Sequence, residues 1–92
     1  MIPIDRVIPR ALETMLRQAP LTPEKVAFAW RNAVGPAVDR VTTVDLQNRV
    51  LQVRVRDRSW QREIERAAVL IRPRLDALLG PGVVRDIKVD VV

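Results

Sequence analysis

Apolar residues at helical spacing mark two segments in the first third of the chain. They recur every three or four positions over residues 8–18, which predicts a first helix there. A second helix is predicted from Pro23, because Thr22 can cap it and proline suits a first helical position. Gly35-Pro36 predicts its end, since glycine accepts a left-handed conformation and proline cannot continue a helix.

From Val41 onward the spacing of apolar residues changes to every second position. Residues 42–46 and 51–55 both alternate between apolar and polar side chains, as expected for two strands with one buried and one wet face. Residues 47–49 separate them, so the pattern predicts a β-hairpin. We expect the turn to be centred on Asn48, because asparagine tolerates a positive φ.

A long helix and a third strand are predicted in the remainder of the chain. Asp57-Arg58-Ser59 offers an N-cap, and Gly80 marks the end of the helix. Its apolar positions step by three or four throughout: Trp60, Ile64, Ala67, Ile71, Leu75 and Leu78. Pro73 removes one backbone hydrogen bond, so we expect a kink, or two abutting helices, near residues 71–72. Residues 83–91 alternate again and predict a strand that could pair beside either strand of the hairpin.

The order helix, helix, strand, strand, long helix, strand predicts an α+β fold. A hairpin is joined through a crossover helix to a third strand, and the helices cover one face of a small three-stranded sheet. No repeat, low-complexity tract or linker interrupts the chain. We therefore expect residues 1–92 to form a single domain that opens with the helix in residues 1–20.

The composition argues against catalysis. Histidine, tyrosine and cysteine are absent and Ser59 is the only serine, so most general bases and nucleophiles of neutral pH are missing. Carboxylates remain, but a chain of 92 residues leaves little volume for the pocket that a catalytic carboxyl needs. We expect a non-enzymatic protein with no cofactor, no metal and no small-molecule substrate.

The composition also favours the cytoplasm. Without cysteine there is no disulfide framework, and no segment resembles a signal peptide or the run of about 20 apolar residues of a membrane span. We therefore expect a cytoplasmic protein that has no membrane partner.

The net charge of +5 is concentrated in one stretch. Residues 49–74 contain eight arginines and three acidic residues, whereas the rest of the chain is balanced. Clustered positive charge favours polyanionic partners. The predicted nucleic-acid-binding surface follows the second strand and the start of the long helix, and consists of Arg49, Arg54, Arg56, Arg58, Arg62 and Arg66. A solvated face that binds nothing is the alternative interpretation.

The aromatic residues do not suggest a base-stacking platform. Trp30 and Trp60 each occupy an apolar stripe of a predicted helix, so we interpret both as buried anchors. Phe28 is the only other aromatic residue. Binding is therefore expected to be mostly electrostatic, to single- or double-stranded DNA with little sequence preference.

Three motifs, in this order and with these gaps, resemble the bacterial DciA family: Trp30-Arg31-Asn32-Ala33-Val34-Gly35, Leu51-Gln52-Val53-Arg54-Val55 and Trp60-Gln61-Arg62-Glu63-Ile64. The resemblance covers about residues 22–91. It implies a KH-like fold and a nucleoid-associated role in bacterial chromosome replication, in which members bind DNA and assist loading of the replicative helicase. It implies no catalytic activity.

Residue by residue, the resemblance carries over structural positions. Trp30, Gly35, Trp60 and Glu63 match signature positions that we interpret as two core anchors, a helix stop and a carboxylate in the first turn of a helix. Arg49 stands where a turn glycine is common in the family. A Gly-x-x-Gly nucleotide clamp is missing from the sequence, so binding is expected to use the arginine surface.

Two other functions fit the same sequence. The arginines could dock onto an acidic surface of a partner protein, such as a helicase, without nucleic acid. A KH-like RNA-binding domain is the third hypothesis.

Overall fold

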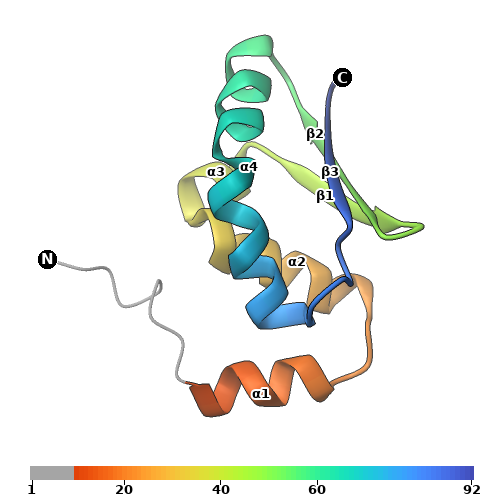
Figure 1. The fold of residues 1–92 in the computed structure, drawn as a ribbon. Helices are drawn as coiled ribbons and strands as arrows, with labels where there is room; N and C mark the ends of the chain where they lie inside the picture. Colours follow the sequence, from red (N-terminus) through yellow and green to blue (C-terminus); the bar gives the residue numbers. More distant parts are fainter. Residues whose placement is uncertain (1–9) are drawn as a thin grey trace, which may run out of the picture.

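The elements follow the predicted order in a computed structural model, which describes residues 10–92 (Figure 1). They are α1 (Arg10–Gln18), α2 (Pro23–Val34), α3 (Pro36–Arg40), β1 (Thr43–Gln47), β2 (Val50–Val55), α4 (Arg58–Leu79) and β3 (Asp86–Val91). The predicted α+β class is confirmed. The predicted first helical residues, Ile8 and Pro9, lie outside the described residues. None of the helices in residues 10–92 is both long and apolar enough to cross a membrane.

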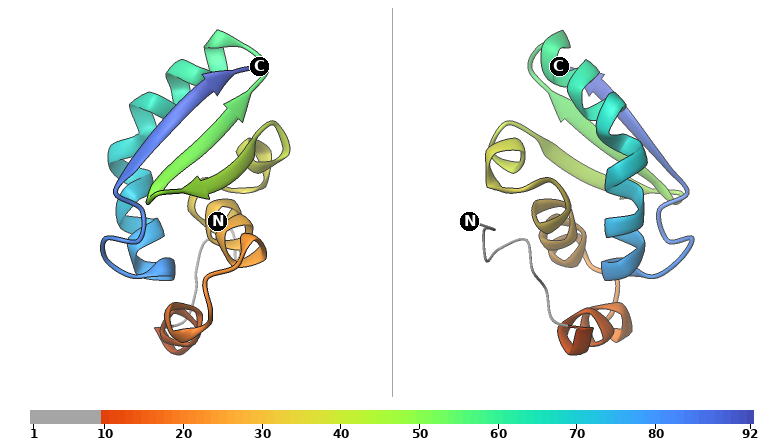
Figure 2. Two further views of the ribbon diagram at one scale, coloured as in Figure 1. Left: turned by 90° about the vertical axis from the view of Figure 1, so that its right-hand side faces the viewer. Right: turned by 60° about the vertical axis from the view of Figure 1, so that its left-hand side comes forward.

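The three strands form one mixed sheet with β2 in the middle. β1 is antiparallel to β2, as the predicted hairpin requires, and β3 is parallel to β2 on its other side. The partner of β3, which the sequence left open, is therefore β2. Figure 2 shows the sheet from its uncovered side in the left-hand view, with α4 behind it and α1 below it.

The core lies between the sheet and the helices. Leu51, Val53 and Val55 on β2 point inward and are almost completely buried. They meet a stripe of α4 and one of α2 whose buried members are Ile64, Ile71, Leu75, Leu78, Leu79, Val26, Ala29, Trp30 and Ala33. Burying each large aliphatic side chain contributes about 1.5–3 kcal/mol. This core fixes α2 and α4 to one face of the sheet, as predicted, while α1 packs against α4.

Trp30 is fully buried, which confirms its predicted role as a core anchor. Its indole Nε1 donates a hydrogen bond of 2.8 Å to the hydroxyl of Thr42, which itself donates to the carbonyl of Val38 at 2.9 Å. The largest side chain of the core thereby joins α2 to the turn between α3 and β1. No buried side-chain nitrogen or oxygen in residues 10–92 is left without a partner.

Gly35 ends α2, as predicted, but Pro36 does not simply stop the helical path. Gly35 has φ 88°, and its N–H caps α2 by donating to the carbonyl of Arg31 at 2.8 Å. Pro36 then occupies the first position of α3, a five-residue helix that the sequence pattern did not predict. Proline suits that position because its missing N–H would have no helical partner there.

α4 passes through Pro73 as one helix, so the predicted alternative of two abutting helices is wrong. Pro73 cannot donate a hydrogen bond to the carbonyl of Val69. The side chain of Val69 is 74% exposed, so this part of the helix faces solvent. Water can satisfy the free carbonyl there, while Ile71 and Leu75 keep the opposite face packed.

The hairpin turn has positive φ at two residues, Asn48 (52°) and Arg49 (67°). Both signs match the type I′ turn that fits the twist of a two-residue hairpin, but glycine is the usual second residue. Here the guanidinium of Arg49 donates to the carbonyl of Gly82, from Nε at 2.9 Å and from Nη2 at 2.6 Å. These bonds tie the turn to the α4–β3 loop and offset the backbone strain.

We expect Arg49→Ala to lower the free energy of unfolding by about 1–2 kcal/mol. The variant keeps a strained φ and loses both bonds to Gly82. Urea unfolding followed by circular dichroism measures the change. Arg31→Ala, at an exposed position of α2, is the control and should stay within about 0.5 kcal/mol of the parent. Equal stability of the two variants would show that the Arg49–Gly82 contact contributes nothing.

Removing the Thr42 hydroxyl, which accepts the hydrogen bond of Trp30, should lower the free energy of unfolding more than removing the Thr42 methyl group. Thr42→Val leaves a buried indole N–H unpaired, which costs about 1–3 kcal/mol of unfolding free energy. Thr42→Ser retains the hydroxyl and should lose well under half as much. Thermal and urea unfolding of both variants test the ranking, and a valine variant as stable as the serine variant would contradict it.

Candidate nucleic-acid interface

The six arginines predicted to bind nucleic acid do not form one continuous surface. Arg49 lies at the hairpin turn and Arg56 just beyond the far end of β2. A strand of this length separates its two ends by roughly 20 Å. Arg49 is further committed to the carbonyl of Gly82 by two hydrogen bonds. The guanidinium of Arg49 therefore has a structural role within the domain. The sequence pattern gave no sign of this contact between distant residues.

Arg54 lies on the uncovered face of the sheet, and that face is not basic. Its guanidinium pairs with the carboxylate of Asp45 on β1 at 3.8 Å, and Asp90 is its neighbour on β3. The strand register gives this face the following charged residues: Asp45, Arg54, Asp86, Lys88 and Asp90. Three acidic residues against two basic ones make the face slightly negative. A phosphate backbone laid across it would meet more repulsion than attraction.

Arg56, Arg58 and Arg62 have a different environment. In the part of the chain that the structure describes, their side chains make no hydrogen bond or ion pair, whereas those of Arg49, Arg54 and Arg66 do. The three are exposed where β2 passes into α4, and Arg58 and Arg62 lie four residues apart on one helix face. We call Arg56, Arg58 and Arg62 the junction surface.

Arg66 continues the junction surface along α4 with a weaker charge. Its guanidinium pairs with Glu63 at 3.8 Å, and both side chains are well exposed. Exposed pairs of this kind contribute about 0–1 kcal/mol, so water and partners compete for them easily. Arg66 therefore lies near the predicted surface but is partly neutralised.

The charges at the start of α4 oppose the helix dipole. A helix N-terminus carries partial positive charge and favours acidic residues in its first turn. α4 begins at Arg58 and has none there, so the predicted place of Glu63 in the first turn is wrong, and Glu63 lies further along the helix. Only the N-cap Asp57 counters this charge, by accepting a hydrogen bond of 2.9 Å from the backbone N–H of Trp60. The arrangement is unfavourable for the helix taken alone, because the arginine charges lie near its partially positive end.

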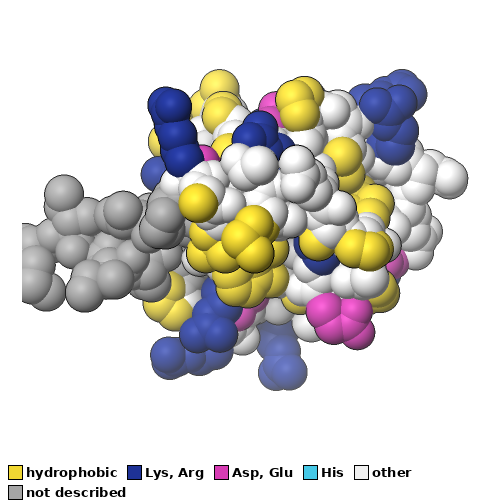
Figure 3. All heavy atoms as spheres, turned by 90° about the horizontal axis from the view of Figure 1, so that it is seen from below, with side chains coloured by type: hydrophobic (Ala, Val, Ile, Leu, Met, Phe, Trp, Pro, Cys, Tyr) yellow, Lys and Arg dark blue, Asp and Glu magenta, His cyan; other side chains and the backbone are white. Residues whose placement is uncertain are grey.

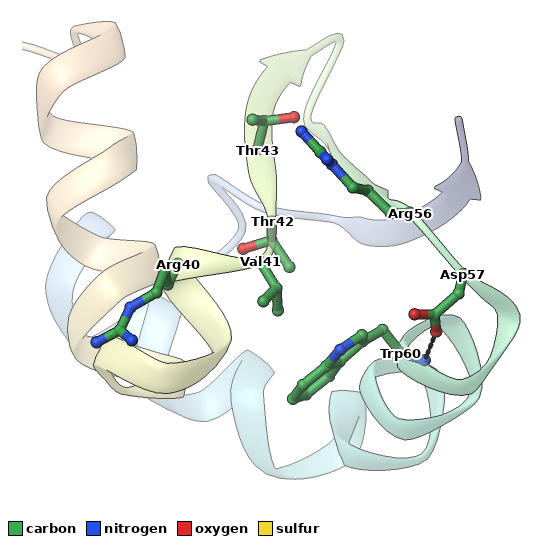
Figure 4. Close-up of a pocket in the computed structure, with 7 residues that line it drawn as sticks. All are labelled: Arg40, Val41, Thr42, Thr43, Arg56, Asp57 and Trp60. Carbon is green, nitrogen blue, oxygen red and sulfur yellow. Dashed lines mark hydrogen bonds between the residues drawn. The ribbon is translucent and has the colours of Figure 1, made fainter.

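Trp60 is only partly buried, so its predicted role as a buried anchor needs correction. Its indole borders a hollow of about 400 Å³ between residues 40–43 and the β2–α4 junction (Figure 4). It also lines a smaller apolar hollow of about 190 Å³ between α4 and the α2–α3 corner. Helical spacing placed Trp60 in the apolar stripe correctly, but no other element covers the start of α4 completely.

Arg40 is a candidate that the sequence pattern did not single out. It is exposed at the end of α3 and lines the hollow on the side opposite Arg56. The two arginines are 16 positions apart, and only the fold brings them to one hollow. No local periodicity or charge count indicates such a pairing.

A separate apolar face lies at the other end of the molecule. α1 exposes Leu12 (39%) and Met15 (66%). Figure 3 shows hydrophobic side chains gathered in the middle of this face, with basic and fewer acidic side chains around them. The face is distinct from the junction surface, because α1 and the start of α4 lie at opposite ends of the fold (Figure 1).

These features define a small α+β protein with a mixed three-stranded sheet and a basic surface at a strand-to-helix junction. The sequence matches the family described as Dna[CI] antecedent, DciA, over residues 3–89. The chain therefore belongs to the DciA family, which confirms the predicted resemblance. Membership implies a role in loading the replicative helicase in bacteria. A comparison with curated proteins found no match.

The cap at the start of the basic helix can be tested directly. Asp57→Ala removes the acceptor for the N–H of Trp60 and should lower the free energy of unfolding by about 1 kcal/mol. Asp57→Asn keeps a capping side chain and should cost far less. Chemical denaturation of both variants measures the difference. An asparagine variant as unstable as the alanine variant would mean that charge, rather than capping, is what Asp57 supplies.

Proposed function

We propose that this protein is a non-enzymatic DNA-binding accessory protein that assists loading of the replicative helicase in the bacterial cytoplasm. We assign its DNA contacts to the junction surface. The observation that carries the proposal is the group of three exposed guanidiniums, free of partners in residues 10–92, beside a helix whose first turn contains no acidic residue. Family membership supports the link to the helicase.

The expected chemistry is recognition of phosphates. Each guanidinium can donate charge-assisted hydrogen bonds to phosphate oxygens, and two parallel bonds are common. Binding releases counterions from the nucleic acid, so affinity falls steeply as salt rises. The junction surface holds no array of amide side chains suited to base edges, and contacts of this kind carry no sequence information. Little sequence preference follows.

The proposal narrows the six predicted arginines to three main contacts. Arg49 is held by Gly82, Arg54 by Asp45 and Arg66 by Glu63. Each of these arginines would have to give up its present partner to bind a phosphate, which would reduce the free energy gained from that contact. Arg56, Arg58 and Arg62 have no partner to give up, so they should contribute most of the affinity for DNA.

The helicase contact belongs on a different surface in this proposal. The apolar face on α1 lies away from the junction surface, so a protein partner and DNA can be bound together. Exposed apolar residues with several basic side chains near them suit a protein surface of mixed apolar and acidic character.

Replacing the junction surface should weaken DNA binding and its salt dependence together. Arg56→Gln, Arg58→Gln and Arg62→Gln combined should reduce affinity for single-stranded DNA by about tenfold or more at moderate salt. The slope of log affinity against log salt should fall by about 2, because up to three phosphate contacts disappear. Fluorescence anisotropy at several salt concentrations measures both quantities.

A matched control separates a local site from net charge. Arg10→Gln, Arg17→Gln and Arg85→Gln remove the same charge from exposed positions on α1 and before β3. This variant should keep most of the salt slope. Equal losses in the two triple variants would contradict the assignment to the junction surface.

The same titrations distinguish the other two functions. Stronger binding to single-stranded RNA than to DNA of equal length would favour an RNA-binding domain. Failure to bind any nucleic acid, together with helicase association that depends on Arg56, Arg58 and Arg62, would favour docking to an acidic protein surface.

A further inference from the structure

We infer that the hollow between residues 40–43 and the β2–α4 junction holds one nucleotide of a single DNA strand, with its base stacked against the indole of Trp60. This inference rests on the proposed DNA binding and adds a specific subsite to it. It assigns to Trp60 a contact that neither the charge of the chain nor its helical pattern indicates.

The hollow has the dimensions of a small-molecule site. Its volume of about 400 Å³ falls in the range of about 300–1,000 Å³ that is usual for ligand pockets. Figure 4 shows the indole of Trp60 along one side, with Arg56 reaching toward Thr43 on the other. Arg40 extends outward from the end of α3. Of these two arginines, Arg56 is the one whose guanidinium is turned toward the hollow.

The two tryptophans of the chain differ in the way that a binding role requires. Trp30 is fully buried, and its N–H is taken by Thr42. Trp60 is partly exposed and borders two hollows, and no side chain or carbonyl in residues 10–92 accepts a hydrogen bond from its indole. A large apolar ring left open beside cationic side chains is an available stacking surface.

The polar groups of the hollow indicate where a phosphate would lie. The hydroxyl of Thr42 is already used, as acceptor for Trp30 and as donor to Val38. The carboxylate of Asp57 is engaged at the helix cap and repels phosphate. Arg56 and the exposed hydroxyl of Thr43 remain, so the phosphate belongs on their side and the base on the side of Trp60.

The combination of an indole and a guanidinium suits a whole nucleotide better than it suits an apolar group or a phosphate alone. An apolar peptide side chain would make no use of the guanidinium of Arg56, and inorganic phosphate would make no use of the indole. A nucleotide uses both, since base–aromatic stacking and phosphate–arginine contacts act together in single-strand binding. Bases within a duplex are already stacked on each other, so the subsite requires a single strand.

The test compares an oligothymidylate with a duplex of equal length. Trp60→Ala should weaken binding of the oligothymidylate by about tenfold, while Trp60→Phe should recover part of the loss. Both should leave the salt slope and the duplex affinity unchanged, because no phosphate contact is removed. Urea unfolding verifies that each variant is folded. Arg56→Gln, a surface change, provides a second test and should weaken the oligothymidylate and lower the salt slope by about one.

Tryptophan fluorescence gives an independent signal. Oligothymidylate should quench the emission of the parent protein but not that of Trp60→Phe, in which only the buried Trp30 remains. Equal oligothymidylate affinity in the parent and Trp60→Ala, or an equal loss toward the duplex, would overturn the inference. If the parent binds neither DNA, the proposed function itself fails. If the parent binds through the junction arginines and Trp60→Ala is unchanged, only the nucleotide subsite is wrong.

Discussion

The burial of β2 between its two neighbours is the constraint on which the rest of the structure depends. Both edges of the strand are hydrogen-bonded, to β1 and to β3, and its inward side chains are almost inaccessible to water. The middle of β2 is therefore covered on both edges and on its inner face. Only the two ends of the strand and the outer face of the sheet are left to contact solvent or a ligand. One end is closed by the bonds of Arg49 to Gly82. At the other end the arginines remain open, and the candidate site forms there.

Local signals in the sequence were sufficient for the order and type of most elements. Alternation in residues 51–55 and helical spacing from Ile64 to Leu78 reflect the burial that the structure has. Gly35 and Gly80 mark helix ends because each caps the preceding helix with its own N–H. The sequence pattern did not predict α3, because a proline is equally compatible with the end of one helix and with the first position of the next.

The candidate site was predicted less completely, because it depends on contacts between distant residues. A count of charge along the chain cannot show that Arg49 bonds to a loop 33 positions away, or that Arg54 faces Asp45 and Asp90. Trp60 illustrates the same limit for burial. It occupies the same stripe as Ile64, yet Ile64 is buried and Trp60 only partly buried, because the stripe extends beyond the elements that pack on it. Periodicity identifies the inward face of a helix, but it does not show how much of that face is covered by other elements.

The arrangement of bonds around Arg49 also determines how the last strand can join the sheet. The backbone carbonyl of Arg49 accepts from the N–H of Arg85 at 2.6 Å, directly before β3 begins. A shift of β3 by one residue would turn Val89 outward and bring Lys88 toward the core. The left-handed turn therefore acts as a reference point for strand alignment. The alignment of β3 with β2 is therefore coupled to the backbone of the hairpin turn, so a change of turn geometry would reach the last strand of the chain without any contact between that strand and β1.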